Sequence, residues 1–256
     1  MKDYISYSEL KIWAECPFKH KLIYIDKKKG FQGNEYTAFG SSIHALCENA
    51  VQGLLDSPDY DDFFDASFDR ELGQLEETRQ DLVEQMRDQA KVITPQIIPA
   101  VLKYFEDYEV FSVEEKLFEK INDFSLDKYQ FKGYIDLVLK TSDGKYHVID
   151  WKTCSWGWDR DKRNSKLVTY QLTLYKRFFC QKHNIDPKLV ETHFALLKRT
   201  AKKDNVEIFR VTSGPRKTNN ALELLRKALK SIENKMFIKN RLSCKNCEFR
   251  KSELCP

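Results

Sequence analysis

The chain has 256 residues, of which 43 are Lys or Arg and 39 are Asp or Glu, and it is 41% hydrophobic with only 9 Gly and 7 Pro. This composition excludes a disordered or fibrous protein, and its length fits one elaborated domain. No stretch is apolar for long enough to span a bilayer, and the opening residues 1–13 lack the apolar centre of a signal peptide. We therefore expect a cytoplasmic protein without a membrane partner.

Charge is distributed unevenly along the chain. Residues 56–88 hold 12 acidic against 3 basic side chains, a net charge of −9, whereas residues 198–256 hold 16 basic against 6 acidic ones, a net charge of +10. A basic half can face an anionic partner, but solvated helix faces explain the same pattern equally well. Charge alone therefore leaves nucleic-acid binding open.

The predicted elements begin with helices. Residues 6–9, Ser-Tyr-Ser-Glu, have the pattern of a capping box, so a helix should start there and stop before Pro17. A second helix should begin after Gly40 with a serine as its cap, and further helical segments, broken near Pro58, Pro95 and Pro99, should follow as far as Tyr108.

From Val110 the apolar period changes to that of strands. Strands are expected over 110–121, 129–140 and 145–152, a helix over 167–183, two strands over 191–199 and 206–211, and a helix over 218–238. This order predicts the α/β class, with a mixed central sheet flanked by helices. The predicted regions of the single domain are an N-terminal segment (1–39), a helical region (40–108), a core (109–212) and a basic helix with a cysteine-rich tail (213–256).

One predicted hairpin brings two carboxylates together. A loop at residues 142–144 pairs Thr141 with Lys145, because Gly tolerates the left-handed conformation that ends a three-residue hairpin loop. The same register places Asp136 opposite Asp150 on one face of the sheet, with Cβ atoms roughly 5 Å apart.

The neighbours of these carboxylates predict a buried site. The register pairs Val138 with Val148 on the carboxylate face, and Leu137 with Ile149 and Ile135 with Trp151 on the other. Two opposed carboxylates in apolar surroundings are costly unless one takes a proton or a cation lies between them. A surface hairpin is the simpler alternative, but the apolar neighbours favour a Mg²⁺ site. Lys152, on the same face, could then orient or deprotonate the attacking water or stabilise the developing charge.

At this point the sequence resembles a known family. Residues 133–136 (GYID) and 148–152 (VIDWK) are similar to the D…(D/E)xK core of PD-(D/E)XK nucleases, specifically their RecB-like branch. Residues 40–44 (GSSIH) resemble its GxxxH motif, residues 171–175 (QLTLY) its QxxxY motif, and residues 6–17 its N-terminal segment ending in Cys-Pro. Each motif alone is weak, whereas the ordered set is specific and covers nearly the whole chain except the acidic helical region.

The resemblance implies a restriction-endonuclease-like core and a role for each matching residue. His44, Asp136 and Asp150 would bind Mg²⁺ or Mn²⁺, Lys152 would be the catalytic lysine, and Gln171 and Tyr175 would be active-site or DNA-contacting groups. Either Glu114 or Glu115 could add a further carboxylate. Without the other motifs, His44 would be interpreted as an ordinary helix histidine and Gln171 as the polar edge of a helix.

A cysteine cluster marks the end of the chain. Cys244, Cys247 and Cys255 form a C-x2-C-x7-C pattern, and Cys16 lies near the other end. A C-x2-C turn lets two thiolates reach one metal, and both zinc and an iron–sulfur cluster accept four thiolates. The one-plus-three arrangement resembles the iron–sulfur subset of RecB-like nucleases, including AddB-type and CRISPR-associated adaptation nucleases, and this resemblance implies a [4Fe-4S] cluster that staples the chain ends. Cys47, Cys154 and Cys180 are expected to be buried small residues.

These patterns predict a metal-dependent DNA nuclease, an exonuclease that acts on single strands or ends in replication, recombination or repair. The chain has no GxxxxGK[ST] phosphate loop, so it should cut without ATP, alone or with a separate helicase or recombination partner. The alternatives are a non-catalytic nucleic-acid-binding protein with a structural zinc or iron–sulfur site, and a zinc-stabilised interaction module.

A candidate surface for the DNA is less specific. The basic side chains proposed for phosphate are Lys198, Arg199, Lys202, Lys203, Arg210, Arg216 and Lys217, with Trp156 and Trp158 as stacking groups. An ordinary solvated face and packing aromatics explain these residues equally well.

Overall fold

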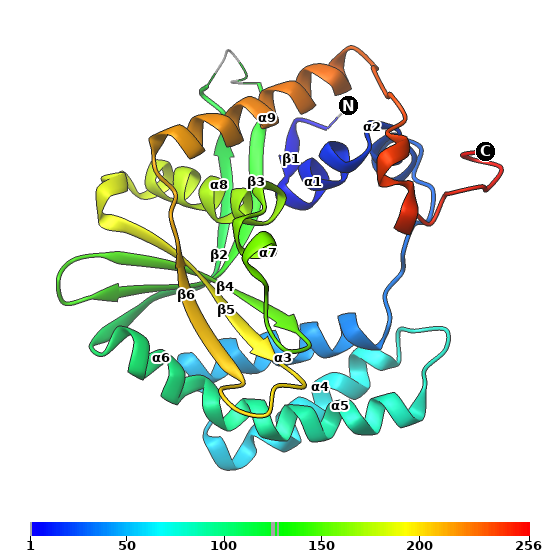
Figure 1. The fold of residues 1–256 in the computed structure, drawn as a ribbon. Helices are drawn as coiled ribbons and strands as arrows, with labels where there is room; N and C mark the ends of the chain where they lie inside the picture. Colours follow the sequence, from blue (N-terminus) through cyan, green and yellow to red (C-terminus); the bar gives the residue numbers. More distant parts are fainter. Residues whose placement is uncertain (1, 124–125, 127) are drawn as a thin grey trace.

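The computed structural model of the protein describes residues 2–123, 126 and 128–256. In this part of the chain six strands form one mixed sheet (Figure 1). They are β1 (Tyr4–Ser6), β2 (Tyr108–Lys120), β3 (Gln130–Thr141), β4 (Tyr146–Cys154), β5 (Val190–Lys198) and β6 (Val206–Val211). The strand order is β1-β3-β4-β5-β6, and β2 also pairs with β3. The predicted α/β class with a mixed central sheet flanked by helices is confirmed.

The long strand β3 is the branching point of the sheet. The antiparallel strand β2 pairs with it from Gln130 to Thr141 and so occupies one edge. The other edge is shared, because parallel β1 pairs with residues 130–132 and antiparallel β4 with residues 137–140. Between these two pairings β3 has a free edge, and the catalytic candidate Asp136 lies there.

Helices cover both faces of the sheet (Figure 1). One core includes Val138, Val148 and Phe194 and is closed by α1 (Tyr7–Glu15), α8 (Lys166–His183) and α9 (Pro215–Glu233). The second core includes Ile149 and Trp151 and is closed by α3 (Glu35–Val51), α4 (Tyr60–Leu72), α5 (Gln80–Ile93) and α6 (Ile97–Phe105). The shorter segments are α2 (Pro17–His20), α7 (Arg160–Asn164), a π-helical turn (Lys21–Ile25), and 3-10 turns at Ser57–Asp59, Thr94–Gln96, Pro187–Leu189 and Arg241–Asn246.

The two ends of the chain pack together. The backbone N–H of Phe18 donates to the carbonyl of Ile238 over 3.3 Å, and the side chain of Asn240 donates to the carbonyl of Glu15 over 2.8 Å. Figure 1 shows α2 beside the C-terminal segment that contains the last 3-10 turn. Residues that are almost maximally separated in sequence are therefore neighbours in space.

The first two helices differ from their predicted starts and caps. Ser6 accepts a hydrogen bond from the N–H of Glu9 as predicted, but the Glu9 carboxylate contacts buried His20 over 2.8 Å instead of closing a capping box. Helix α3 begins at Glu35, with Asn34 as its cap, so the predicted start after Gly40 is wrong. Gly40 lies within this helix, and a Cβ added there would make an ordinary contact of 3.6 Å with the Thr153 hydroxyl on β4.

Most other predicted elements match within a few residues. Strand β1 was missed, because three residues give no measurable period. The break expected at Pro99 does not occur, since Pro99 lies in the first turn of α6, where a missing N–H breaks no helical hydrogen bond.

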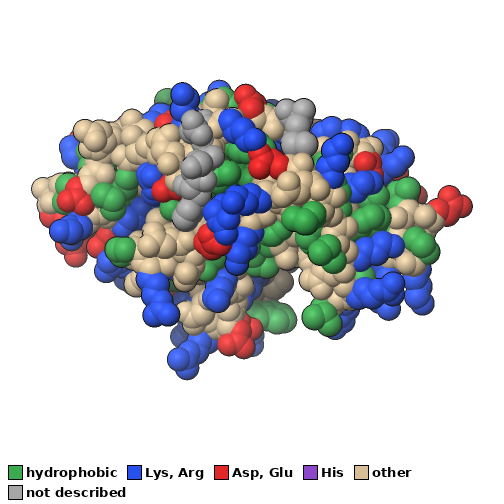
Figure 2. Space-filling model, turned by 90° about the horizontal axis from the view of Figure 1, so that it is seen from above, with side chains coloured by type: hydrophobic (Ala, Val, Ile, Leu, Met, Phe, Trp, Pro, Cys, Tyr) green, Lys and Arg blue, Asp and Glu red, His purple; other side chains and the backbone are tan. Residues whose placement is uncertain are grey.

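No helix among the described residues combines the length and apolar character needed to cross a membrane. The face seen in Figure 2 is viewed from above, the side on which α9 lies in Figure 1. Lys and Arg side chains are spread across it, and Asp and Glu side chains lie among them. This side of the molecule therefore exposes many basic side chains.

Candidate active site

The site begins where β3 and β4 separate. The predicted register is confirmed from Lys140 paired with Tyr146 to Leu137 paired with Ile149. One step further, the backbone ladder is replaced by a side chain, because the Oδ2 atom of Asp136 accepts a hydrogen bond of 2.7 Å from the N–H of Trp151. The predicted pairing of Ile135 with Trp151 is therefore absent from the described ladder.

Asp150 is the most buried carboxylate at this fork, with 1% of its surface exposed. Its Oδ1 atom accepts a hydrogen bond of 2.7 Å from Gln171 on α8. Its Oδ2 atom forms an ion pair with the ammonium of Lys152. One ammonium serves two neighbouring carboxylates here, Asp150 and Asp136, so a further cation would compensate the remaining negative charge.

The electrostatics of the two carboxylates also fit a cation. Burial raises the pKa of Asp150 to about 6, and Lys152 offsets only part of this effect. Burial likewise raises the pKa of Asp136 to about 6. Burial on its own would lower the pKa of Lys152, but the two carboxylates raise it, so its ammonium stays charged at neutral pH. The ionised pair is destabilised by desolvation, and a divalent cation would relieve that cost.

Helix α3 brings His44 to the same place. Its Nδ1 atom lies 3.6 Å from Asp136 Oδ2. Burial lowers the pKa of His44 to about 4, with a further contribution from Lys152, so the imidazole is neutral at pH 7. A neutral imidazole has the lone pair that a metal ligand needs.

Sequence reasoning missed Glu48, one helical turn beyond His44. Its carboxyl group shares a hydrogen bond with Glu114 on β2, and burial together with Glu114 raises the pKa of Glu48 to about 7. Glu114 has a positive φ of 47° and lies at the register position opposite Asp136. A strained backbone at a polar residue is typical of functional sites. The only sequence signal was the spacing of His44 and Glu48, which is common in any helix.

The choice between the two adjacent glutamates of β2 is also resolved by their contacts. The Glu115 carboxylate contacts Lys182 and His183 on α8, at 2.6 and 2.8 Å. These contacts hold Glu115 away from the candidate active site. Glu114 is the one of the two that lies beside the candidate active site.

Gln171 and Tyr175 support Asp150 from α8. The Gln171 amide, which donates to Asp150, lies 3.2 Å from the Tyr175 hydroxyl and can donate to it as well. The Tyr175 ring lies against β3 at Gly133, where an added Cβ would come within 2.8 Å of the ring. Glycine is therefore required at Gly133 for Tyr175 to reach the site. The structure thus brings all six predicted residues together: His44, Asp136, Asp150, Lys152, Gln171 and Tyr175.

The four cysteines at the chain ends line one cavity of about 350 Å³. Cys16 Sγ accepts a hydrogen bond of 3.4 Å from the N–H of Asn240. Within the described part of the chain, no three cysteine sulfurs all lie within 4.8 Å of one another. The structure therefore shows a shared cavity but no close cysteine cluster, and the metal staple stays a prediction.

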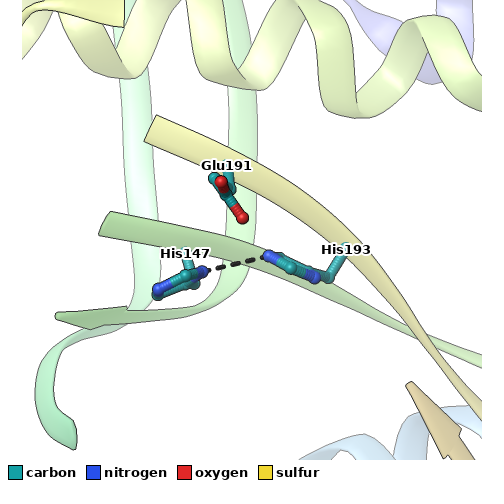
Figure 3. A group of neighbouring side chains, drawn as sticks. All are labelled: His147, Glu191 and His193. Carbon is teal, nitrogen blue, oxygen red and sulfur yellow. Dashed lines mark hydrogen bonds between the residues drawn. The ribbon is translucent and has the colours of Figure 1, made fainter. Parts of the chain in front are cut away.

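A separate histidine group lies on β4 and β5 (Figure 3). His147 Nδ1 and His193 Nε2 are 3.1 Å apart, and Glu191 offers an oxygen within 4.8 Å of both rings. His147 alternates with Asp150 along β4 and so faces the opposite side of the sheet. Glu191 pairs with Arg210 over 3.2 Å. This group is therefore distinct from the candidate active site.

Both ring nitrogens of His147, and the nitrogen of His193 that faces it, have hydrogen-bond partners without a metal. The Thr141 hydroxyl donates to Asp143 over 2.6 Å, so its oxygen is free to accept from His147 Nε2 at 3.0 Å. That donor assignment leaves His147 Nδ1 as an acceptor for the N–H of His193. We interpret the two histidines as a buried neutral pair.

This interpretation predicts a pH-dependent stability. Burial lowers the pKa of His193 to about 3, with contributions from His147 and Arg210. A folded-state pKa below the unfolded value means that the unfolded chain binds the proton first, so the stability that this residue contributes is lost as pH falls below about 6.5. For this group alone the free energy of unfolding should fall by about 2 kcal/mol between pH 7.5 and pH 5. Chemical denaturation of the wild type and His193→Phe at both pH values checks this, and an equal fall in the two proteins would contradict it.

Comparison with known proteins identifies the family. The profile of the PD-(D/E)XK nuclease superfamily matches residues 4–256. The chain belongs to this superfamily. The predicted resemblance is confirmed at that level, whereas the branch that carries an iron–sulfur cluster stays a prediction.

A solved structure shows the same fold as this nuclease. The crystal structure of a "Putative exonuclease" from Eubacterium rectale aligns with a TM-score of 0.62 at 14% identity, over 97% of this chain and 88% of that chain. A second structure, SSO0001, aligns with a TM-score of 0.45 at 15% identity, over 97% of this chain and 84% of the other. No protein in a curated collection matches the nuclease.

Proposed function

We propose that this nuclease hydrolyses phosphodiester bonds of DNA with Mg²⁺ or Mn²⁺ held by His44, Asp136 and Asp150. The observation that carries this proposal is the buried Asp150 carboxylate, which lies close to the Asp136 carboxylate and is compensated only in part by the charged Lys152. A bound divalent cation would lower the pKa of a water molecule and neutralise phosphate charge. Superfamily membership and the fold shared with the E. rectale exonuclease support the same reaction.

The side chains around the carboxylates have separate tasks in this proposal. Lys152 stays protonated, so we assign it to the negative charge that develops on the phosphate and to the orientation of the water, and not to proton abstraction. Gln171 fixes the rotamer of Asp150, and Tyr175 supports Gln171. Glu48 and Glu114 share a hydrogen bond, and burial raises the pKa of both, so this pair is placed to accept a proton released at the site.

The proposed substrate is single-stranded DNA or DNA ends, and the proposed action is exonucleolytic, in replication, recombination or repair. A helicase or recombination protein would then supply the strand. The Lys and Arg side chains on the face of Figure 2 support an anionic partner.

Digestion of labelled DNA tests this function. Linear and circular single strands and linear duplexes should be compared with Mg²⁺, with Mn²⁺ and with chelator. We expect metal-dependent release of short products from linear single strands and protection of the circle. Cutting of the circle would make the enzyme an endonuclease, and tight DNA binding without cutting under any metal would favour a non-catalytic binding protein.

We further propose that the cavity lined by Cys16, Cys244, Cys247 and Cys255 holds a [4Fe-4S] cluster. In a tetrahedral zinc site with Zn–S bonds of about 2.3 Å, the four sulfurs lie roughly 3.8 Å apart. An iron–sulfur cluster binds each thiolate through a different iron atom and so needs wider spacing. The cavity of about 350 Å³ that all four cysteines line supports a shared metal centre, and the one-plus-three arrangement of the cysteines favours the cluster over zinc.

A further inference from the structure

A groove of about 370 Å³ lies directly beyond the catalytic lysine. Thr153, the residue after Lys152, and Tyr36 on α3 both line it. Tyr36 and His44 are eight residues apart on α3, which corresponds to about 12 Å along the helix axis. The groove therefore adjoins the candidate active site along β4 and α3, at a distance that one nucleic-acid strand can span.

Trp156 is the prominent side chain of this groove. Its surface is 77% exposed, although large aromatic side chains are usually buried in a folded domain. Trp158, the other predicted stacking residue, is only 8% exposed and packs against Phe194 with ring centroids 5.0 Å apart. Trp156 is therefore an exposed residue beside the candidate active site, whereas Trp158 is a structural residue of the core.

The loop that presents Trp156 is fixed on both sides. The N–H groups of Arg199 and Thr200 donate to the carbonyls of Cys154 and Ser155, both over 2.8 Å. Gly157, directly after Trp156, has a φ of 134°, which is open to glycine but strained for other residues. An exposed indole on a fixed turn loses little conformational freedom when it binds a planar ligand.

Cationic groups complete the groove. The Arg199 guanidinium lies 4.7 Å from the centre of the Tyr36 ring and also donates to Gln89 over 3.2 Å. The Lys162 ammonium lies 4.8 Å from the centre of the Trp158 ring. Both cations are held by neighbouring groups on the same groove as the exposed indole, and a guanidinium stacked on an aromatic ring still has N–H donors at its edge for a phosphate.

We propose that this groove is a nucleobase subsite, in which Trp156 stacks on an unpaired base of the bound strand while Arg199 and Lys162 contact its phosphates. The choice of occupant follows from the indole, because an unpaired base presents a free face for stacking, whereas the faces of bases inside a duplex are already stacked. The proposal rests on the proposed DNA nuclease and deepens it, since it assigns the preference for single strands to one side chain next to the site.

The test measures binding of a short fluorescent oligothymidylate by anisotropy, without divalent metal, so that cleavage does not contribute. Trp156→Ala should weaken the affinity roughly tenfold, because stacking on an aromatic side chain contributes about that much per base. Trp156→Phe should retain most of the affinity. Arg199→Gln should reduce the salt dependence by about one phosphate contact, whereas Lys91→Gln, an exposed change on α5, should not.

The results of this experiment distinguish a failure of the proposed subsite from a failure of the proposed nuclease activity. Equal affinities of the wild type and Trp156→Ala, or no binding by either, would overturn the subsite, even if both proteins cut DNA. Binding that depends on Trp156 in a protein that cuts no DNA would support the subsite and refute the nuclease. If Trp156→Ala weakens the affinity for a blunt duplex as much as the affinity for the oligothymidylate, the tryptophan contacts something other than an unpaired base.

Discussion

Asp150→Asn should abolish DNA cleavage and, in the absence of metal, stabilise the folded protein. Cleavage should fall on the order of 10³-fold or more, because the substitution removes a proposed metal ligand at the reacting phosphate. Stability should rise because Asn fills nearly the same space without a charge. The pKa of Asp150 is raised to about 6 by burial, so its ionised form destabilises the fold by on the order of 3 kcal/mol above that pH.

The pH dependence of this stabilisation has a definite sign. A folded-state pKa above the unfolded value means that the wild type loses stability as pH rises from about 4 to about 6. The advantage of Asp150→Asn should therefore be largest above pH 6 and disappear near pH 4. Thermal melts at pH 4 and pH 8 in chelator measure it, with Asp88→Asn on the surface of α5 as the matched control.

Lys152→Ala should also abolish cleavage, but with the opposite effect on stability. Its ammonium compensates the two carboxylates, so its removal leaves Asp136 and Asp150 with less positive charge nearby. The metal-free variant should be less stable than the wild type, and added Mn²⁺ should recover part of the loss. Cleavage at a near-normal rate by folded Asp150→Asn or Lys152→Ala would refute the assigned site.

Cys16→Ser should lower the thermal stability and remove the bound iron. The cavity joins the N-terminal helices to the last residues of the chain, so a cluster in it would close most of the chain into one loop and restrict the unfolded ensemble. Loss of a few kcal/mol in a domain of this size lowers Tm on the order of 10 °C. Anaerobically purified wild type should be brown and contain iron and acid-labile sulfide in equal amounts.

Cys154→Ser is the matched control, since Cys154 lies outside this cavity, and it should keep both colour and iron. A colourless wild type with one zinc ion per chain would refute the cluster and leave the staple. Protein without metal, in which all four cysteines react as free thiols, would refute both.

The hairpin was predictable because its signals are local. The glycine-ended loop at 142–144 and the alternation of apolar residues fix the register, and the register alone places Asp136 near Asp150. The separation of β3 and β4 beyond Leu137 could not be predicted in this way, because it depends on the Asp136 side chain replacing a backbone partner.

The part of the site that comes from distant segments was less predictable. His44 was placed only through the resemblance to a nuclease motif, and Glu48 was missed, because nothing in the sequence of α3 says which strand it faces. Gly40 suggested the start of a helix, yet it lies within α3, where an added Cβ would make an ordinary contact of 3.6 Å with the Thr153 hydroxyl. A glycine inside a helix and one at a helix end look the same in sequence.

Anomalous scattering from a Mn²⁺-soaked crystal would locate the catalytic metal most directly. We expect a peak within coordination distance of the Asp136 and Asp150 carboxylates, close to His44 and absent from crystals of Asp150→Asn. A peak at His147 and His193 instead, or an empty fork between β3 and β4 in a protein that cuts DNA with Mn²⁺, would contradict the proposed mechanism.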